Sequence, residues 1–98
     1  MEEKPNYYAI IPAIVRYDKA LSSSEKLIYG EISSLTNKEG FCWASNTYFA
    51  DLYDVTKTAV SGWVSKLEKG GHIKTEVIGN NERKIWINHR ISPIQENF

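Results

Sequence analysis

The sequence predicts a small α+β domain, mainly α, in which three main helices precede a β-hairpin. Residues 24–37, 45–53 and 57–69 each repeat apolar side chains at the spacing of one helical face. Residues 73–77 and 84–88 alternate apolar and polar side chains around a Gly/Asn turn, which is typical of a hairpin. The length of 98 residues suits one domain with short connections.

The first element is a short apolar and aromatic segment, residues 7–11, which ends at Pro12. This pattern indicates a short strand or an extended lead-in. Proline is favoured in the first turn of a helix, so we expect Pro12 to open a short helix over residues 13–17.

The first main helix is expected over residues 24–37. The serines at 22–24 offer N-caps, and Glu25 suits the positive end of the helix dipole. A polar turn at 37–40 ends the helix. Its apolar stripe consists of Leu27, Ile28, Ile32 and Leu35.

The second main helix follows a minor strand. Residues 41–43, Phe-Cys-Trp, favour β structure, and Trp43 is expected to lie in the core. Ser45 is the expected N-cap of the helix. The apolar side of this helix consists of Tyr48, Phe49, Leu52 and Tyr53.

The third main helix is expected over residues 57–69, with Thr56 as its N-cap and the glycines at 70–71 as its stop. Only residues 54–55 separate that cap from the second helix. Trp63 belongs to the apolar face, so we expect it in the core rather than stacked on a base. The full apolar set is Ala59, Val60, Trp63, Val64 and Leu67.

The second and third helices together predict a helix-turn-helix, because a short turn between amphipathic helices makes them cross at a large angle and share one core. This geometry frees one face of the third helix to enter the major groove of DNA. Small, polar or basic residues without an acid occupy that face: Lys57, Thr58, Ser61, Gly62, Ser65 and Lys66. Hydroxyls bond phosphate or base edges, and lysine reaches phosphate or guanine. A Ser-rich solvated helix is the alternative interpretation.

Two further segments are candidate DNA contacts. The hairpin offers Asn80, Asn81, Arg83 and Lys84 at or beside its tip, as a wing that touches backbone or minor groove, or as an ordinary surface turn. Trp86 in the hairpin is expected to be exposed or to cover its back. Ser45, Asn46 and Thr47 begin the second helix and can donate to one phosphate, although N-capping explains Ser45 equally well.

The charge distribution favours a basic working face on an acidic scaffold. Net charge is zero, but residues 1–55 carry five Lys and Arg against eight Asp and Glu, a net −3. Residues 56–90 carry seven basic and three acidic residues, a net +4, and Glu96 adds −1. Chance is the alternative explanation for counts this small. If the distribution is not due to chance, residues 56–90 are the part of the chain expected to contact nucleic acid.

The sequence carries no sign of catalysis, a metal or a cofactor. It contains no GxSxG motif, no Gly-rich phosphate loop and no spaced carboxylate pair in an apolar setting. Cys42, His72 and His89 do not have a metal-ligand spacing. We therefore expect no enzyme, no catalytic residue and no cofactor.

The protein is expected to be cytoplasmic and not bound to a membrane. One cysteine permits no intramolecular disulfide, and the polar start MEEKPNYY is not a signal peptide. No apolar run approaches the roughly 18 residues that a membrane helix needs.

Three segments carry a resemblance to a known family: SEKLIYGEI, GFCWASNTYFADLY and the turn-plus-helix VTKTAVSGWVSKLEKGG. Over residues 6–88 the chain resembles the N-terminal winged helix-turn-helix domain of replication initiators and replisome organisers. These proteins belong to phages, plasmids and integrative elements of low-GC Gram-positive bacteria, and some carry a DnaD-like C-terminal part. The resemblance implies binding to duplex origin DNA. It places the start of the recognition helix at Thr56, Lys57, Thr58 and Ser61, and the wing at residues 80–84.

The sequence leaves alternatives open. We expect residues 1–90 to form the winged helix-turn-helix domain and residues 91–98 to begin a linker or mark a boundary. A transcriptional regulator of the winged-helix type, or a protein-interaction module without DNA binding, is also consistent with the pattern. Expected partners are double-stranded DNA, a second copy of the chain on DNA, and replication proteins that bind through a C-terminal region outside this sequence.

Overall fold

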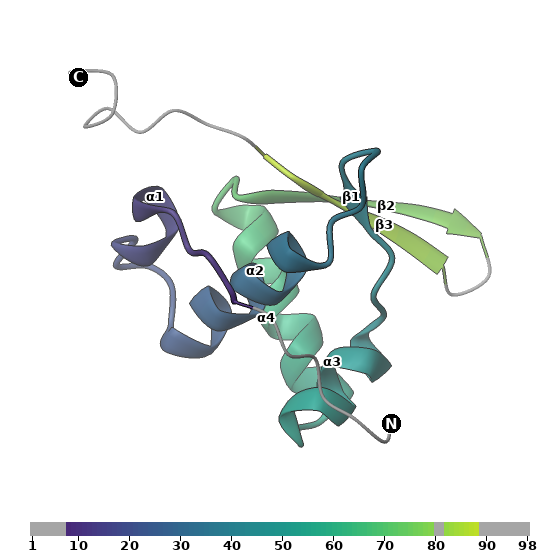
Figure 1. The fold of residues 1–98 in the computed structure, drawn as a ribbon. Coiled ribbons are helices and arrows are strands. Elements are labelled where there is room, and N and C mark those ends of the chain that lie inside the picture. Colours follow the sequence, from purple (N-terminus) through teal and green to yellow (C-terminus); the bar gives the residue numbers. More distant parts are fainter. Residues whose placement is uncertain (1–7, 80–81, 89–98) are drawn as a thin grey trace.

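The computed structural model describes residues 8–79 and 82–88, and it confirms an α+β winged helix-turn-helix fold (Figure 1). Figure 1 shows the helices gathered on one side of the sheet, with the β2–β3 hairpin extending beyond them. The elements in chain order are α1 (Ala13–Arg16), α2 (Ser23–Ser34), β1 (Phe41–Cys42), α3 (Asn46–Tyr53), α4 (Lys57–Lys69), β2 (Ile73–Gly79) and β3 (Glu82–Ile87).

The helix starts follow local capping chemistry. Ser22 caps α2 in a reciprocal box, in which its Oγ accepts from the Glu25 N–H at 3.2 Å and its own N–H donates to the Glu25 carboxylate at 2.8 Å. The predicted caps of the next two helices are confirmed. Ser45 Oγ accepts from the N–H of Tyr48, and Thr56 Oγ1 accepts from the N–H of Ala59, both at 3.1 Å.

The end of α2 lies three residues before the predicted one. Thr36 Oγ1 donates to the Ile32 carbonyl at 2.9 Å and thereby satisfies one of the last carbonyls of the helix. Asn37 instead exchanges hydrogen bonds with Phe41: its N–H donates to the Phe41 carbonyl at 2.9 Å and its Oδ1 accepts from the Phe41 N–H at 3.1 Å. Asn37 therefore belongs to the turn that starts β1.

The segment before α1 is the extended lead-in, since residues 8–12 form no strand. Its residues pack on α2 at Gly30, where an added Cβ would lie 3.0 Å from Ala9 Cβ and 3.3 Å from Ile11 Cγ1. Ser34 Oγ donates to the Tyr8 carbonyl at 3.1 Å. The side chain of Tyr8 is 94% exposed, and Tyr7 lies outside the described residues.

The core lies between the three main helices and the inner face of the sheet. Burial of each large apolar side chain contributes roughly 1.5–3 kcal/mol. Trp63 is partly buried against this core, as predicted. The largest fully buried side chains are Phe49, Ile28, Ile32, Leu67, Ile85, Val15 and Val60.

The sheet is antiparallel in the order β1-β3-β2, so β3 is its central strand. Along β3, Ile85 and Ile87 are buried, and Trp86 between them alternates to the outer face. The strands reach farther toward the tip than predicted, because Gly79 pairs with Glu82 after a bulge that follows Val77. The predicted tip residues Asn80 and Asn81 lie outside the described residues.

The prediction that Trp43 lies in the core is wrong, since its side chain is 50% exposed. Cys42 is fully buried on the inner face of the sheet, and alternation therefore directs Phe41 and Trp43 to the opposite face. The rings of Phe41 and Trp43 meet edge to face with centroids 5.1 Å apart. Trp86 covers the outer side of the hairpin and packs on Phe41, with the two ring centroids 5.0 Å apart.

Candidate nucleic-acid interface

A tight connection joins α3 to α4. Asp54 ends α3 in the left-handed conformation with φ of 56°, which aspartate tolerates better than most residues. The next N–H, that of Val55, donates back to the Ala50 carbonyl at 3.0 Å. Thr56 already caps α4, so residues 54–56 alone connect the two helices.

A polar contact fixes α3 against α2. The hydroxyl of Tyr53 donates to Oε2 of Glu31 at 3.0 Å. Burial, and then the hydrogen bond and charge of Glu31, raise the pKa of Tyr53 above its ordinary value. The phenol therefore stays protonated and keeps its role as donor at neutral pH.

The two faces of α4 differ as the sequence predicts. Val60, Val64 and Leu67 are buried. The opposite face is solvent-exposed throughout and consists of Lys57, Thr58, Ser61, Gly62, Ser65 and Lys66. Gly62 lies in the middle of this face, and an added Cβ there would meet nothing within 4 Å. The middle of this face is therefore open space, with room for a side chain or a ligand beside Gly62.

The one acidic residue in the second half of α4 is engaged with the sheet. The carboxylate of Glu68 accepts from the N–H and the hydroxyl of Thr75 on β2, each at 3.0 Å. These bonds tie α4 to the hairpin and hold the carboxylate toward the sheet. The exposed face of α4 therefore presents cations and hydroxyls without a competing anion.

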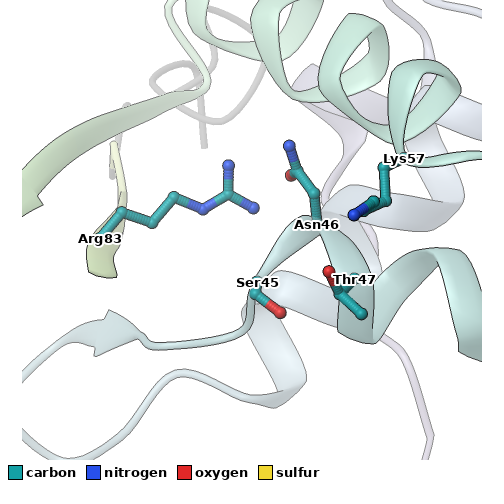
Figure 2. Close-up of a pocket in the computed structure, with 5 residues that line it drawn as sticks. All are labelled: Ser45, Asn46, Thr47, Lys57 and Arg83. Carbon is teal, nitrogen blue, oxygen red and sulfur yellow. The ribbon is translucent and has the colours of Figure 1, made fainter. Parts of the chain in front are cut away.

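A cavity of about 420 Å³ adjoins the start of α4, and Figure 2 shows the five side chains around it. Three elements contribute them: the start of α3, the first residue of α4 and strand β3. All five are sequence-predicted contacts, and the structure brings them together: Ser45, Asn46, Thr47, Lys57 and Arg83. We call this cavity the cationic pocket, because two of these five described residues are basic and none of the five is acidic.

Arg83 crosses from the sheet to the helices. Figure 2 shows its side chain extending from β3 toward Asn46, with Lys57 on the far side of the pocket. One terminal nitrogen donates to the Ala44 carbonyl at 3.4 Å. Burial lowers the pKa of Arg83, but guanidinium starts so high that it remains charged. No sequence pattern indicates that the Ala44 carbonyl anchors this side chain.

Two buried polar atoms in the cationic pocket lack a hydrogen-bond partner among the described residues: Nε of Arg83 and Oδ1 of Asn46. Buried polar groups are rarely left unbonded, so such atoms call for a water, an ion or a ligand. Both atoms are shielded from solvent in this conformation, so an anion oxygen in the pocket would bond to the Arg83 N–H only after a shift of that side chain. Rotation of the Asn46 amide by half a turn would exchange this oxygen for the NH₂ group, a donor suited to an anion.

The start of α3 adds to the positive potential of this pocket. The first N–H groups of a helix point out of its end without intrahelical partners, and the helix dipole is positive there. Ser45 Oγ is engaged as the cap, so Ser45 does not lose its structural role by lining the pocket. The arrangement matches a site for a phosphate oxygen.

Comparison with protein families identifies the motif that these helices form. The helix-turn-helix domain family matches residues 19–73, more than half of the 98-residue chain. The chain belongs to the helix-turn-helix domain family. The matched span includes α2, α3 and α4 and ends at the first residue of β2. Comparisons with curated proteins and with solved structures gave no match.

Membership in the helix-turn-helix family indicates binding to double-stranded DNA. In this motif the second helix of the pair enters the major groove, and the first crosses the backbone. Here these helices are α4 and α3. The exposed acid-free face and the cationic pocket lie on the elements that the motif uses for these two contacts.

Lys84 does not line the cationic pocket of the helix-turn-helix domain. It follows Arg83 on β3 and therefore lies on the opposite, outer face of the sheet. Its ammonium lies 4.5 Å from the ring centroid of Phe41, 5.7 Å from that of Trp43 and 5.8 Å from that of Trp86. Cation–π attraction holds the charge against these rings. A DNA contact by Lys84 stays a prediction.

Two further features are absent from residues 8–79 and 82–88. Within these ranges, no group of three or more His, Cys, Asp or Glu side chains is placed to hold a metal ion. No helix in the same ranges combines the length and apolar character that crossing a bilayer requires.

Proposed function

We propose that this helix-turn-helix domain binds duplex DNA with sequence preference at the replication origin of a phage, plasmid or mobile element. The observation that carries the DNA contact is the convergence of Lys57 and Arg83 on the start of α3. Two cations and a helix N-terminus around unsatisfied buried polar atoms form a phosphate site beside the exposed face of α4.

The cationic pocket and the exposed face of α4 have different roles in the proposed recognition of DNA. The phosphate held in the cationic pocket sets the position of the domain on the backbone, which carries no sequence information. The exposed face of α4 then meets base edges in the major groove, where Ser61, Ser65 and Lys66 offer hydroxyls and an ammonium. The small side chains on this face, including Gly62, permit close approach of the helix backbone.

The role in replication is supported by the resemblance of three sequence segments to initiator and replisome-organiser domains. The fold does not separate that role from transcriptional regulation, because both use the same winged helix. Arrays of repeated sites are expected of an origin, whereas single sites beside promoters are expected of a regulator.

The test of DNA binding begins with selection of bound sequences from a randomised duplex pool. Affinity for the selected duplex is then measured by fluorescence anisotropy over a series of salt concentrations. Log affinity is expected to fall with log salt, at a slope near −0.9 for each neutralised phosphate. Absence of salt-dependent binding at low ionic strength would contradict the proposal and favour a protein-interaction module.

The origin assignment needs a separate experiment in a cell that encodes the chain. Cross-linked DNA recovered with the protein is sequenced and mapped. Recovery of a repeated site at the replication origin of the element supports the proposal. Recovery at promoters alone would assign the protein to transcription while leaving DNA binding intact.

A further inference from the structure

A second cavity, of about 430 Å³, lies beside the cationic pocket. Ser45 lines both, so the two spaces adjoin at the start of α3. Aromatic rings form two of its walls: Trp43, half-exposed after β1, and Tyr48 in the first turn of α3. The described residues that line it are Leu35, Asn37, Trp43, Ala44, Ser45 and Tyr48. We call this space the aromatic pocket.

We infer that the aromatic pocket receives an unpaired nucleobase of a DNA strand, so that the domain also binds single-stranded DNA. The neighbouring phosphate of that strand occupies the cationic pocket, and this part of the inference rests on the proposed function. The two adjoining spaces thus form one nucleotide site, with the base among aromatic rings and the phosphate between Lys57 and Arg83.

The chemistry of the pocket walls suits a nucleobase. Aromatic side chains stack on any base, because every base has a π-face. Asn37 adds a polar edge: its Oδ1 accepts from the Phe41 N–H at 3.1 Å, which fixes the amide and leaves its NH₂ group as the donor that this residue offers. Base edges carry the carbonyl and ring-nitrogen acceptors that such a donor needs.

Charge favours a nucleic acid over an apolar peptide as the occupant. The Lys84 ammonium lies 5.7 Å from the Trp43 ring centroid, and Lys57 and Arg83 lie across Ser45 in the adjoining pocket. No carboxylate is among the described residues that line either space. Aromatic rings interleaved with cations are the pattern of a single-strand platform, whereas an apolar peptide gains nothing from three cations.

The exposure of Trp43 is a second reason to expect a nucleobase in the aromatic pocket. A half-exposed tryptophan loses much of the stabilisation that full burial of its large ring supplies. Trp43 nevertheless stands directly between the outer face of the sheet and the start of α3, on the connection that leads to the cationic pocket. Stacking on a base buries the ring when the strand binds.

The experiment compares two fluorescein-labelled probes under the same low-salt buffer: an oligothymidylate of about 12 nucleotides and a mixed-sequence duplex of about 20 base pairs. Wild type is expected to bind both. Trp43→Ala should weaken oligothymidylate binding roughly five-fold to a hundredfold and leave duplex binding within about twofold. Trp43→Phe should retain most of the affinity for the single strand, because it keeps an aromatic ring.

Two control variants separate the loss of the Trp43 ring from misfolding and from the loss of any exposed aromatic ring. Trp43→Leu removes the ring but keeps an apolar side chain, so it should lose single-strand affinity even if Trp43→Ala fails to fold by circular dichroism. Tyr17→Ala removes an exposed aromatic ring outside the pocket and should change neither affinity.

The inference is overturned if wild type does not bind oligothymidylate, or if folded Trp43→Ala and Trp43→Leu bind it as wild type does. Equal losses on both probes would place Trp43 in the duplex interface and also overturn it. Failure of the proposed function is distinct: wild type would then bind the single strand through Trp43 without binding duplex.

Discussion

His72 and Asp18 lie 54 residues apart in the sequence, yet Nε2 of His72 is 2.7 Å from Oδ2 of Asp18. The contact joins the connection between α1 and α2 to the turn after α4. His72 is almost fully buried, whereas the Asp18 side chain is about one-quarter exposed. The hydrogen bond from His72, followed by that from the Ala20 N–H, lowers the pKa of Asp18 below its ordinary value of 3.8.

This contact predicts a loss of stability in acid. The folded pKa of Asp18 is depressed, so its contribution is present above the unfolded value and is lost as the pH falls through the folded one. Asp18→Asn should lower the free energy of unfolding by about 1 kcal/mol at neutral pH, since a charge-assisted hydrogen bond becomes a neutral one. Urea titrations at a series of pH values, followed by circular dichroism, measure both effects.

Other carboxylates titrate in the same range, so the difference between wild type and Asp18→Asn is the informative quantity. This difference should be constant near neutral pH and shrink below about pH 4. A difference that persists unchanged at the lowest pH would show that the Asp18 charge does not stabilise the fold.

The two helical glycines provide a matched pair. Gly62 lies in open space, so Gly62→Ala should raise the free energy of unfolding by about 0.5–1 kcal/mol, the helix-propensity gain. Gly30→Ala has the same propensity gain, but its Cβ would lie 3.0 Å from Ala9 Cβ and displace the lead-in segment. Gly30→Ala should therefore stabilise less than Gly62→Ala, as measured by urea unfolding.

A larger side chain separates the sites further. Gly30→Leu should be destabilising by about 1–3 kcal/mol, because the added atoms force Ala9 and Ile11 off α2. Gly62→Leu should be close to neutral or stabilising. Equal effects at the two positions would mean that the lead-in segment does not pack on α2 in solution.

Much of the fold follows from local signals. The bounds of α4, Lys57–Lys69, are the predicted ones, because Thr56 and the following glycines fix both ends within a few residues. The helix α2 ends before the predicted residue because Asn37 bonds to Phe41, and Phe41 is held by its pairing with Trp86 far along the chain. Side chain to backbone bonds of this kind compete with helix formation and leave no mark in apolar periodicity.

The site was predictable as a set of residues but not as a pocket. Ser45, Lys57 and Arg83 were each expected to contact DNA for separate reasons, and their convergence depends on the register of β3. A slip of one residue would turn Lys84 inward and Arg83 outward. The outward position of Trp43 follows from its alternation with Cys42, whose burial the structure reveals, whereas the hydrophobicity of tryptophan favoured the core.

The two serine caps test whether the start of α3 has a role beyond capping. Ser22→Ala and Ser45→Ala each remove an N-cap, so each should lower the free energy of unfolding by about 1 kcal/mol. Only Ser45 lines the cationic pocket, so only Ser45→Ala should also weaken DNA binding, as measured by anisotropy below the unfolding transition. Equal DNA affinity in the two variants would reduce Ser45 to a structural cap.

Lys57 should contribute to affinity through a phosphate. Lys57→Ala should weaken binding to every duplex and make the salt slope shallower by about 0.9, the value for one phosphate contact. Lys38→Ala is the matched control: it removes the same charge from an exposed turn outside the pocket and should leave the slope unchanged. If both variants shift the slope alike, the effect is one of net charge and not of the cationic pocket.

Arg83 should require its planar fork as well as its charge. The guanidinium has one bond to the Ala44 carbonyl, and its Nε has no partner among residues 8–79 and 82–88, so a bound phosphate oxygen would complete its bonding. Lysine keeps the charge but offers one donor group on a flexible stem. Arg83→Lys should therefore weaken duplex binding by about 1 kcal/mol or more while leaving the salt slope near that of wild type. Arg83→Ala should lower both affinity and slope. Wild-type affinity in Arg83→Lys would mean that Arg83 acts as a point charge, and the unpartnered Nε would then need a solvent molecule rather than DNA.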